Sequence, residues 1–283
     1  MIYLGRIAIE QSDGDEAVGW LEQAIKKNDR SSQHDFSHLG GMNMGSMTEA
    51  SPRFIARMGG LFYLLMVVSG GFGSVARKGI IVAGDAAATA TNIMAHPSQY
   101  QLGFAGDVLL VATYVVVVAY FHRMLRPVNR SVALVAAYFG LMGCAVLASA
   151  LVFQLAPLAV LGHATYLNVF KVDELQAQAY LFLRLYNQAY GISLVFFGFF
   201  MLVTGYLIFR STFLPRVLGV MFSIGGLAAL TFLAPAWGAS HLSWVLLFDI
   251  GEALLPLWLL LKGVNAERWK EQNCATADRL NAA

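Results

Sequence analysis

Apolar residues form six long stretches from Met58 onward, separated by short polar segments. The stretches cover residues 58–76, 102–121, 132–161, 189–209, 214–233 and 242–261. Each is long enough to cross the hydrocarbon core of a bilayer, which takes about 20 helical residues. The pattern therefore predicts an all-α fold, a polytopic membrane helical bundle with about six transmembrane helices.

The sequence does not fix where the third span ends. Residues 132–161 are about ten residues longer than one crossing needs, and they contain Pro157. Such a segment can tilt, kink, or end early and continue along the interface. Asp173 and Glu174, which follow it, are expected in an outer loop before the fourth span begins at Ala189.

The orientation follows from the basic residues near the ends of the stretches. The side that holds both termini carries ten of them: Arg53, Arg57, Arg123, Arg126, Arg130, Arg210, Arg216, Lys262, Arg268 and Lys270. The opposite side carries Arg77, Lys78 and Lys171, and also Arg184 if that residue belongs to a loop. Lysine and arginine in short loops stay cytoplasmic, so both termini are predicted to be cytoplasmic.

The composition agrees with a protein dissolved in lipid. Hydrophobic residues make up 58% of the chain and charged residues only 13%, against about half and a quarter in soluble domains. The net charge of +2 indicates no nucleic-acid partner, and the lipid bilayer is the expected partner. Cys144 lies inside the third stretch and Cys274 in the polar tail, so both are expected as free thiols.

Residues 1–40 differ from the rest and resemble one tetratricopeptide repeat. Leu4, Gly5, Ala17, Leu21 and Ala24 stand where that repeat places its packing residues. One repeat predicts a short soluble helical hairpin, but such repeats are stable only when about three stack together. A partly disordered extension is therefore the alternative, and a start of translation at Met47 is a further hypothesis.

The predicted organisation has four parts. The hairpin or extension covers residues 1–40, a linker covers 41–52, the six-span domain covers 53–268, and a cytoplasmic tail covers 269–283.

Four local motifs occur in a fixed order along the membrane part. They are ARMGGLFYLL at 56–65, GDAAATATNI at 84–93, LRPVNR at 125–130 and LKGVN at 261–265. Over about residues 53–268 the chain resembles the bacterial membrane family called domain of unknown function 4386 (DUF4386). The resemblance implies a multi-span protein of a bacterial cytoplasmic (inner) membrane, and it implies no activity or catalytic residues.

The first outer loop carries a polar motif with two interpretations. Asp85 is placed to cap a short alanine-rich helix that ends before His96 and Pro97. Alternatively, Asp85, Thr89 and Asn92, at helical spacings of four and three, line an outward-facing vestibule and offer oxygen ligands to a cation or polar solute.

Charged residues inside the apolar stretches are the sharper signal. They are Asp107 in the second stretch, Arg184 near the fourth, and Asp249 with Glu252 in the sixth. Because a charge at a span centre costs about 2.5–3.5 kcal/mol, these groups should face the bundle interior and find partners. We expect Arg184 to pair with Asp249 or Glu252, which share one helix face.

Two functional hypotheses follow, and an enzyme ranks last because no nucleophile, histidine cluster or established acid–base pair appears. The simpler hypothesis is a non-enzymatic membrane scaffold or sensor subunit with a protein partner at the cytoplasmic face. The alternative is a small secondary transporter with a polar intramembrane site at Arg184, Asp249, Glu252 and Asp107. No cofactor and no metal are predicted, and the small-molecule or ion substrate stays unspecified.

Overall fold

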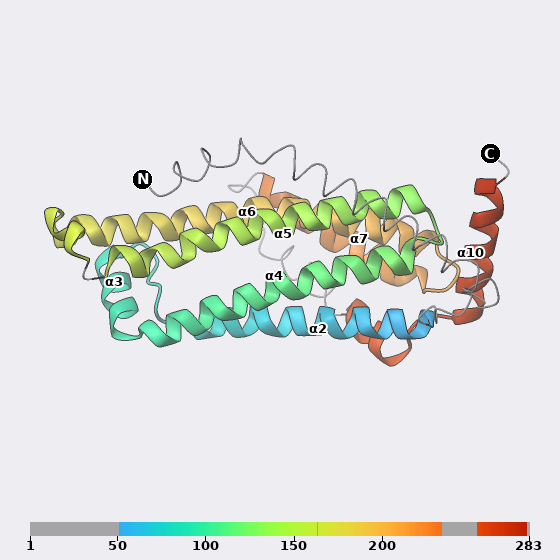
Figure 1. The fold of residues 1–283 in the computed structure, drawn as a ribbon, viewed down its shortest axis with the longest axis horizontal. Helices are drawn as coiled ribbons and strands as arrows, with labels where there is room; N and C mark the ends of the chain where they lie inside the picture. The colour runs from blue at the N-terminus through green and yellow to red at the C-terminus, as the bar shows by residue number, and fades with distance from the viewer. Residues whose placement is uncertain (1–50, 163, 234–253, 282–283) are drawn as a thin grey trace, which may run out of the picture. The chain divides into compact units, whose positions relative to one another are not determined.

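The computed structural model describes residues 51–162, 164–233 and 254–281. The chain divides into two compact units, Met1–Glu49 and Ala50–Ala283, and all described residues belong to the second. The predicted hairpin at 1–40, Asp249 and Glu252 lie outside the described residues. The described elements are α2 (Pro52–Ala76), α3 (Ala86–Ala95), α4 (Pro97–Leu125), α5 (Arg130–Val160), η2 (Thr165–Val169), α6 (Val172–Arg210), α7 (Arg216–Leu230), η3 (Thr231–Leu233) and α10 (Ala266–Asn281) (Figure 1).

Five helical segments are long and apolar enough to cross a membrane. They are α2, α4, α5, α6 and the segment Arg216–Leu233, which joins α7 to η3. The prediction of an all-α membrane bundle is therefore confirmed. The sixth stretch is described only from residue 254, and residues 254–261 are helical, so the count of six spans stays a prediction.

An aromatic cluster forms the centre of the bundle core. Tyr63 from α2 meets Phe121 from α4 edge-on at 5.7 Å between ring centroids, and Phe121 meets Phe200 from α6 at 6.2 Å. Phe222 from α7 meets Phe200 at 6.4 Å. All four side chains are buried, so one apolar layer joins four of the spanning helices.

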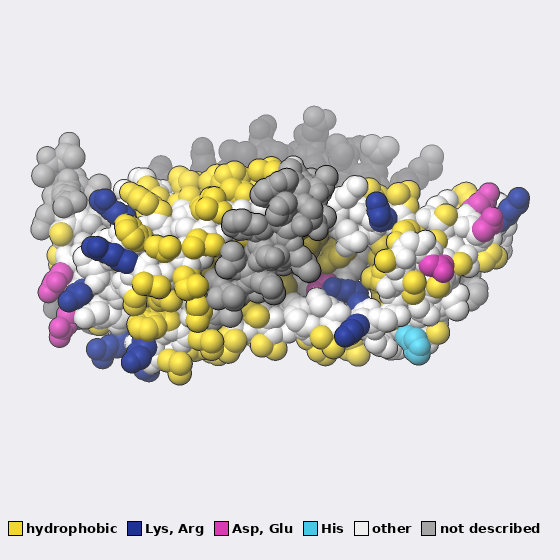
Figure 2. Space-filling view, turned by 180° about the vertical axis from the view of Figure 1, so that it is seen from behind, with side chains coloured by type: hydrophobic (Ala, Val, Ile, Leu, Met, Phe, Trp, Pro, Cys, Tyr) yellow, Lys and Arg dark blue, Asp and Glu magenta, His cyan; other side chains and the backbone are white. Residues whose placement is uncertain are grey.

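α2 turns an apolar stripe outward. Leu61, Leu65, Val68, Phe72 and Val75 are all exposed, at spacings of three and four residues that place them on one side of the helix. Figure 2 shows hydrophobic side chains covering much of the visible face, with Lys and Arg side chains at one end and at scattered positions over the other half. This distribution is typical of a bundle whose outer surface contacts lipid tails.

The C-terminal helix α10 forms hydrogen bonds with the α4–α5 and α6–α7 connections, at the end of the bundle where α2 begins. Trp269 Nε1 donates to the carbonyl oxygen of Met124 at 2.9 Å, which satisfies one of the last acceptors of α4. Thr276 Oγ1 donates to the carbonyl oxygen of Pro127 at 2.7 Å, and Gln272 Oε1 accepts from Thr212 N at 3.1 Å. Part of the predicted tail is therefore an ordered helix.

α6 is much longer than the predicted fourth span. It starts at Val172, not at Ala189, and its 39 residues extend over about 58 Å, nearly twice the hydrocarbon thickness. Asp173 and Glu174 lie in its first turn, so the prediction that they belong to a loop is wrong. The hydropathy pattern marked only the part of the helix that needs to be apolar.

The extra length of α4, α5 and α6 builds a small second core beyond the apolar layer. Ile80, Ile93 from α3, Tyr100 from α4 and Leu183 from α6 are buried together, and Leu158 and Leu161 at the end of α5 pack against them. Tyr180 supports this outer extension by accepting a hydrogen bond from Gly84 N at 2.7 Å.

Candidate functional site

Three glycines bring α2 and α4 into close contact next to the most polar part of the bundle. A Cβ added to Gly106 would lie 3.0 Å from the carbonyl oxygen of Ser69, and one added to Gly73 would lie 3.0 Å from that of Gly103. The Gly73 position also leaves only 2.5 Å between such a Cβ and Asp107 Oδ1. These helices can approach this closely only without side chains at the crossing.

The close approach brings Arg77 to Asp107. Arg77 caps the C-terminal end of α2, and its Nη1 lies 2.6 Å from Asp107 Oδ2 on α4. The side chains are only 12% and 9% exposed, so both charges are largely removed from water. Such a pair is stable only when further hydrogen bonds satisfy the remaining polar groups.

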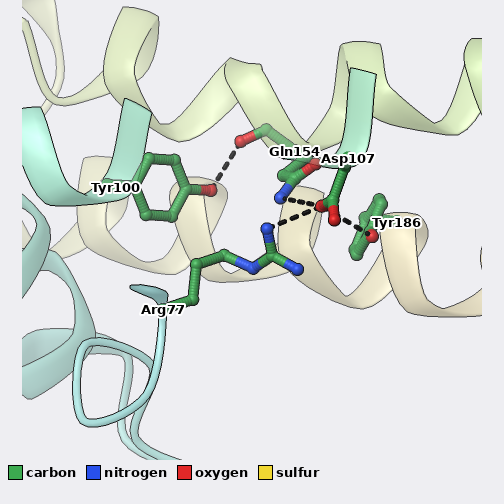
Figure 3. A network of polar contacts seen from close by, with 5 residues as sticks. All are labelled: Arg77, Tyr100, Asp107, Gln154 and Tyr186. Atoms are coloured by element: carbon green, nitrogen blue, oxygen red, sulfur yellow. Dashed lines mark hydrogen bonds and ion pairs between the residues drawn. The ribbon is translucent and has the colours of Figure 1, made fainter. Parts of the chain in front are cut away.

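Side chains from α5 and α6 supply those bonds to the carboxylate. Gln154 Nε2 donates to Asp107 Oδ2 at 2.8 Å, and the Tyr186 hydroxyl donates to the same oxygen at 3.4 Å. Tyr100 donates to the backbone oxygen of Gln154 at 2.5 Å. Figure 3 shows the five residues, which come from α2 and its cap, α4, α5 and α6, so one network links all these helices.

Helix geometry places this network near one edge of the hydrocarbon layer. Twenty residues separate Arg57 from Arg77 along α2 and its cap, which corresponds to about 30 Å at 1.5 Å per residue. That distance equals the thickness of the hydrocarbon core. If Arg57 lies at one surface, the Arg77–Asp107 pair therefore lies close to the other, where a charge costs less than at the centre.

A cavity of about 390 Å³ opens beside the pair between α2, α4, α5 and α6. Arg77, Asp107 and Tyr186 line it together with the exposed residues Ser74 and Asn187. Its size is at the lower end of the range for small-molecule sites, and it combines apolar walls with a few converging polar groups. The arrangement can hold a small polar solute.

Aromatic side chains line the inner part of the cavity. Tyr114 from α4 and Phe197 from α6 stack at 4.2 Å between ring centroids and both line the cavity. Phe121 and Phe200, each buried, lie in the cluster next to them. Within the described residues, a packed aromatic layer therefore lies next to the inner part of the cavity.

Residues 58–263, more than two thirds of the chain, match the family described as Domain of unknown function (DUF4386). The chain belongs to the DUF4386 family. No curated protein and no solved structure matches it. The family description names no activity, so the function of this DUF4386 chain has to be inferred from the site itself.

Of the polar residues predicted inside the DUF4386 membrane domain, Asp107 lies in the network. Arg184 lies on α6 with its side chain exposed, and it forms no hydrogen bond or ion pair with any described residue. Asp249 and Glu252 lie outside the described residues. The expected pairing of Arg184 with either carboxylate therefore stays a prediction, and the pair in the described part is Arg77 with Asp107.

The outer-loop residues of the DUF4386 motif at 84–93 have local partners. Asp85 accepts a hydrogen bond from Ala88 N at 2.8 Å and caps α3, which confirms the predicted cap and helix. Thr89 is 1% exposed and donates to the backbone oxygen of Asp85, while Asn92 Nδ2 lies 3.3 Å from that of Gly79. These bonds connect α3 with the loop that follows α2.

The sequence reasoning missed most of the network. Arg77 was counted only as an orientation residue, and Gln154 and Tyr186 were not identified. Gln154 carried a readable signal, because it is a large polar side chain inside an apolar stretch. Tyr186 carried none, since it precedes the apolar stretch on a helix whose start was placed too late.

The described residues offer little for a metal ion. No group of three or more histidine, cysteine, aspartate or glutamate side chains gathers anywhere in the described ranges. The polar groups of the network are better suited to hydrogen bonding and charge complementarity than to coordination.

Proposed function

We propose that this DUF4386 protein is a non-enzymatic sensor subunit of a bacterial cytoplasmic membrane that binds a small polar solute in the cavity beside Arg77 and Asp107. The observation that carries the proposal is the pairing of two buried charges on the wall of an open cavity. Buried ionic groups inside a membrane protein are costly and are typical of functional positions.

The chemistry of the cavity favours a solute that carries both charges. Arg77 and Asp107 present opposite charges on the cavity wall, so a solute with both a carboxylate and an ammonium group is complementary to it. Arg77 uses Nη1 for the pair, which leaves guanidinium donors for a carboxylate. A free amino acid carries both groups, and Ser74 and Asn187 add neutral polar contacts.

The aromatic layer favours a sensor over a protein that conducts the solute across the membrane. The Tyr114–Phe197 stack and the cluster around Phe121 close the described bundle on the side of the cavity away from Asn187. A solute held there can shift the packing of α2, α4 and α6 without crossing the layer.

The opposite end of the bundle offers a place to pass the signal on. The start of α2, the connection between α4 and α5, and α10 meet there, and this end carries the ten basic residues predicted to be cytoplasmic. A protein partner at this face, contacted through α10 or the hairpin predicted at 1–40, completes the proposed sensor.

A small secondary transporter is the second candidate. It is favoured by the charged pair itself, because acidic residues that face the interior of a membrane bundle are typical of ion and solute pathways. In that case the structure corresponds to one state of an alternating cycle, and the aromatic layer is a gate.

The experiment measures binding and flux on the full chain. Free amino acids are added one at a time to detergent-solubilised protein with the Cys274→Ser substitution. Thermal unfolding is monitored through the reaction of the buried Cys144 thiol with a thiol-reactive fluorophore. A ligand at 100 times its Kd stabilises the folded state by about 2.7 kcal/mol. We expect saturable stabilisation by some amino acids and no uptake of the same compounds into proteoliposomes.

Two neighbouring residues on α6 provide a matched pair of variants. Asn187→Leu places a branched apolar side chain at the cavity and should abolish the stabilisation, whereas Gln188→Leu changes an exposed residue that does not line it. Saturable uptake that Asn187→Leu removes would replace the sensor by the transporter. No stabilisation by any amino acid would contradict the proposed ligand class.

A further inference from the structure

A second cavity lies at the end of the bundle opposite the Arg77–Asp107 pair. It measures about 510 Å³ and lies between the start of α2, the connection before α7 and the segment that leads into α10. Four basic side chains line it: Arg53, Arg57, Lys262 and Arg268. No aspartate or glutamate is among its described lining residues, so its charge is strongly positive.

These basic groups are largely free to bind a ligand. Arg53, Arg57 and Lys262 are exposed and form no side-chain hydrogen bond or ion pair with any described residue. Arg268 makes one long contact, from Nη1 to the backbone oxygen of Thr212 at 3.4 Å. Four cations without an acidic partner among the described residues converge on this cavity, and their summed potential attracts an anion.

The backbone adds to this potential. α2 begins at Pro52, α7 at Arg216 and α10 at Ala266, and each of these residues adjoins a residue that lines the cavity. Helix starts carry partial positive charge, which favours phosphate and other anions. Side chains and helix ends therefore select the same sign of charge.

The floor of the cavity is apolar. Phe213, Leu214 and Val264 are buried there, and Trp258 is half-buried. A tryptophan at the end of an apolar stretch is typical of the headgroup level of a membrane. Arg57 and Lys262 stand at the ends of two such stretches, so the cavity lies where the headgroup and glycerol region of a lipid would lie.

We propose that this basic cavity binds the phosphate headgroup of an anionic phospholipid. The phosphate oxygens accept hydrogen bonds from the guanidinium groups of Arg53 and Arg57 and from the ammonium group of Lys262, while the glycerol region rests against Trp258. The shared chemistry is that of a phosphate ester, and the position between apolar stretches favours the lipid over a soluble ester.

The test uses native mass spectrometry of the full chain released from detergent micelles doped with defined lipids. Wild-type protein should retain one molecule of phosphatidylglycerol at lipid concentrations where no phosphatidylcholine is retained. Arg57→Gln combined with Lys262→Gln should weaken that binding by about 30-fold, since each basic residue near an anionic headgroup contributes about a factor of five.

A charge-matched control separates the cavity from the general positive charge of this end. Arg123→Gln combined with Lys270→Gln removes two exposed basic residues that do not line the cavity, and it should change the binding less than threefold. Thermal unfolding reported by Cys144 verifies that both double variants fold. Equal losses in the two double variants, or equal retention of phosphatidylcholine, would overturn the site.

A soluble competitor distinguishes the two sources of a phosphate ester. Glycerol 3-phosphate should displace phosphatidylglycerol only at concentrations far above that of the lipid, because it lacks the acyl chains that would lie along the adjoining apolar stretches. Displacement at comparable concentrations would overturn the lipid as the ligand.

Discussion

Individual residues in this bundle matter most where a charge is buried. Arg77 and Asp107 compensate each other, and Gln154 and Tyr186 also donate hydrogen bonds to the carboxylate. Removing one member of a buried pair leaves the other without compensation, which costs more than the intact pair contributes. Arg77 and Asp107 also line the proposed solute cavity, so stability and binding depend on the same pair.

Asp107→Asn and Arg77→Gln should each destabilise the protein by about 3 kcal/mol, and the double variant should recover much of the loss. For a domain of this size that corresponds to a drop in Tm of about 6–12 °C in each single variant. Cys144 labelling during thermal unfolding measures it. Lys78→Gln, an exposed neighbour without a described partner, is the control, and additive losses in the double variant would contradict coupling of the pair.

Pairs of helices depend on small residues that permit close contact. Two glycines of α2 lie at such contacts: Gly60, where an added Cβ would lie 2.9 Å from the backbone oxygen of Pro256, and Gly73. Gly71 differs, because an added Cβ there meets nothing within 4 Å. Glycines two residues apart therefore have different structural roles.

Gly73→Ala should destabilise the protein by about 1–3 kcal/mol, because the new methyl group overpacks the contact with α4 at Asp107. Gly71→Ala should be neutral or stabilise by up to about 1 kcal/mol, since alanine is the better helix former. Unfolding midpoints of the two variants, compared side by side, measure the difference. Equal effects would show that the α2–α4 contact is looser than described.

Element lengths show where sequence reasoning reached its limit. The apolar stretches located five spanning segments, because the membrane requires each to be apolar over its thickness. They did not locate the start of α6 at Val172, because a helix outside the bilayer can be amphipathic and need not be hydrophobic. Packing around Tyr100 and Leu183 stabilises that outer part, and those contacts are tertiary.

The whole molecule places the start of α2 and α10 at one end and the tip of η2 at the other. Trp269 on α10 reaches Met124 at the end of α4, while Tyr166 in η2 is 71% exposed at the turn between α5 and α6. With the excess of basic residues at the first end, we infer that this end is cytoplasmic.

A membrane-impermeant maleimide applied to spheroplasts should label Tyr166→Cys in a Cys274→Ser background and leave Cys274 of the wild type unlabelled until the membrane is permeabilised. Cys144 is buried and should not interfere. The ratio of labelling before and after permeabilisation is the measurement. Labelling of Cys274 in intact spheroplasts would reverse the orientation and move the solute cavity to the inside.

The sequence by itself determined the solvent, the helical class and the approximate positions of the spans, because hydrocarbon imposes the same requirement on every span regardless of its neighbours. It also singled out Asp107 as a residue in need of a partner. Only the tertiary structure decided that the partner is Arg77, thirty positions away, and that Gln154 and Tyr186 join it. Which groups meet depends on the glycine-lined approach of α2 to α4 and on the rotation of each helix, and hydropathy encodes neither.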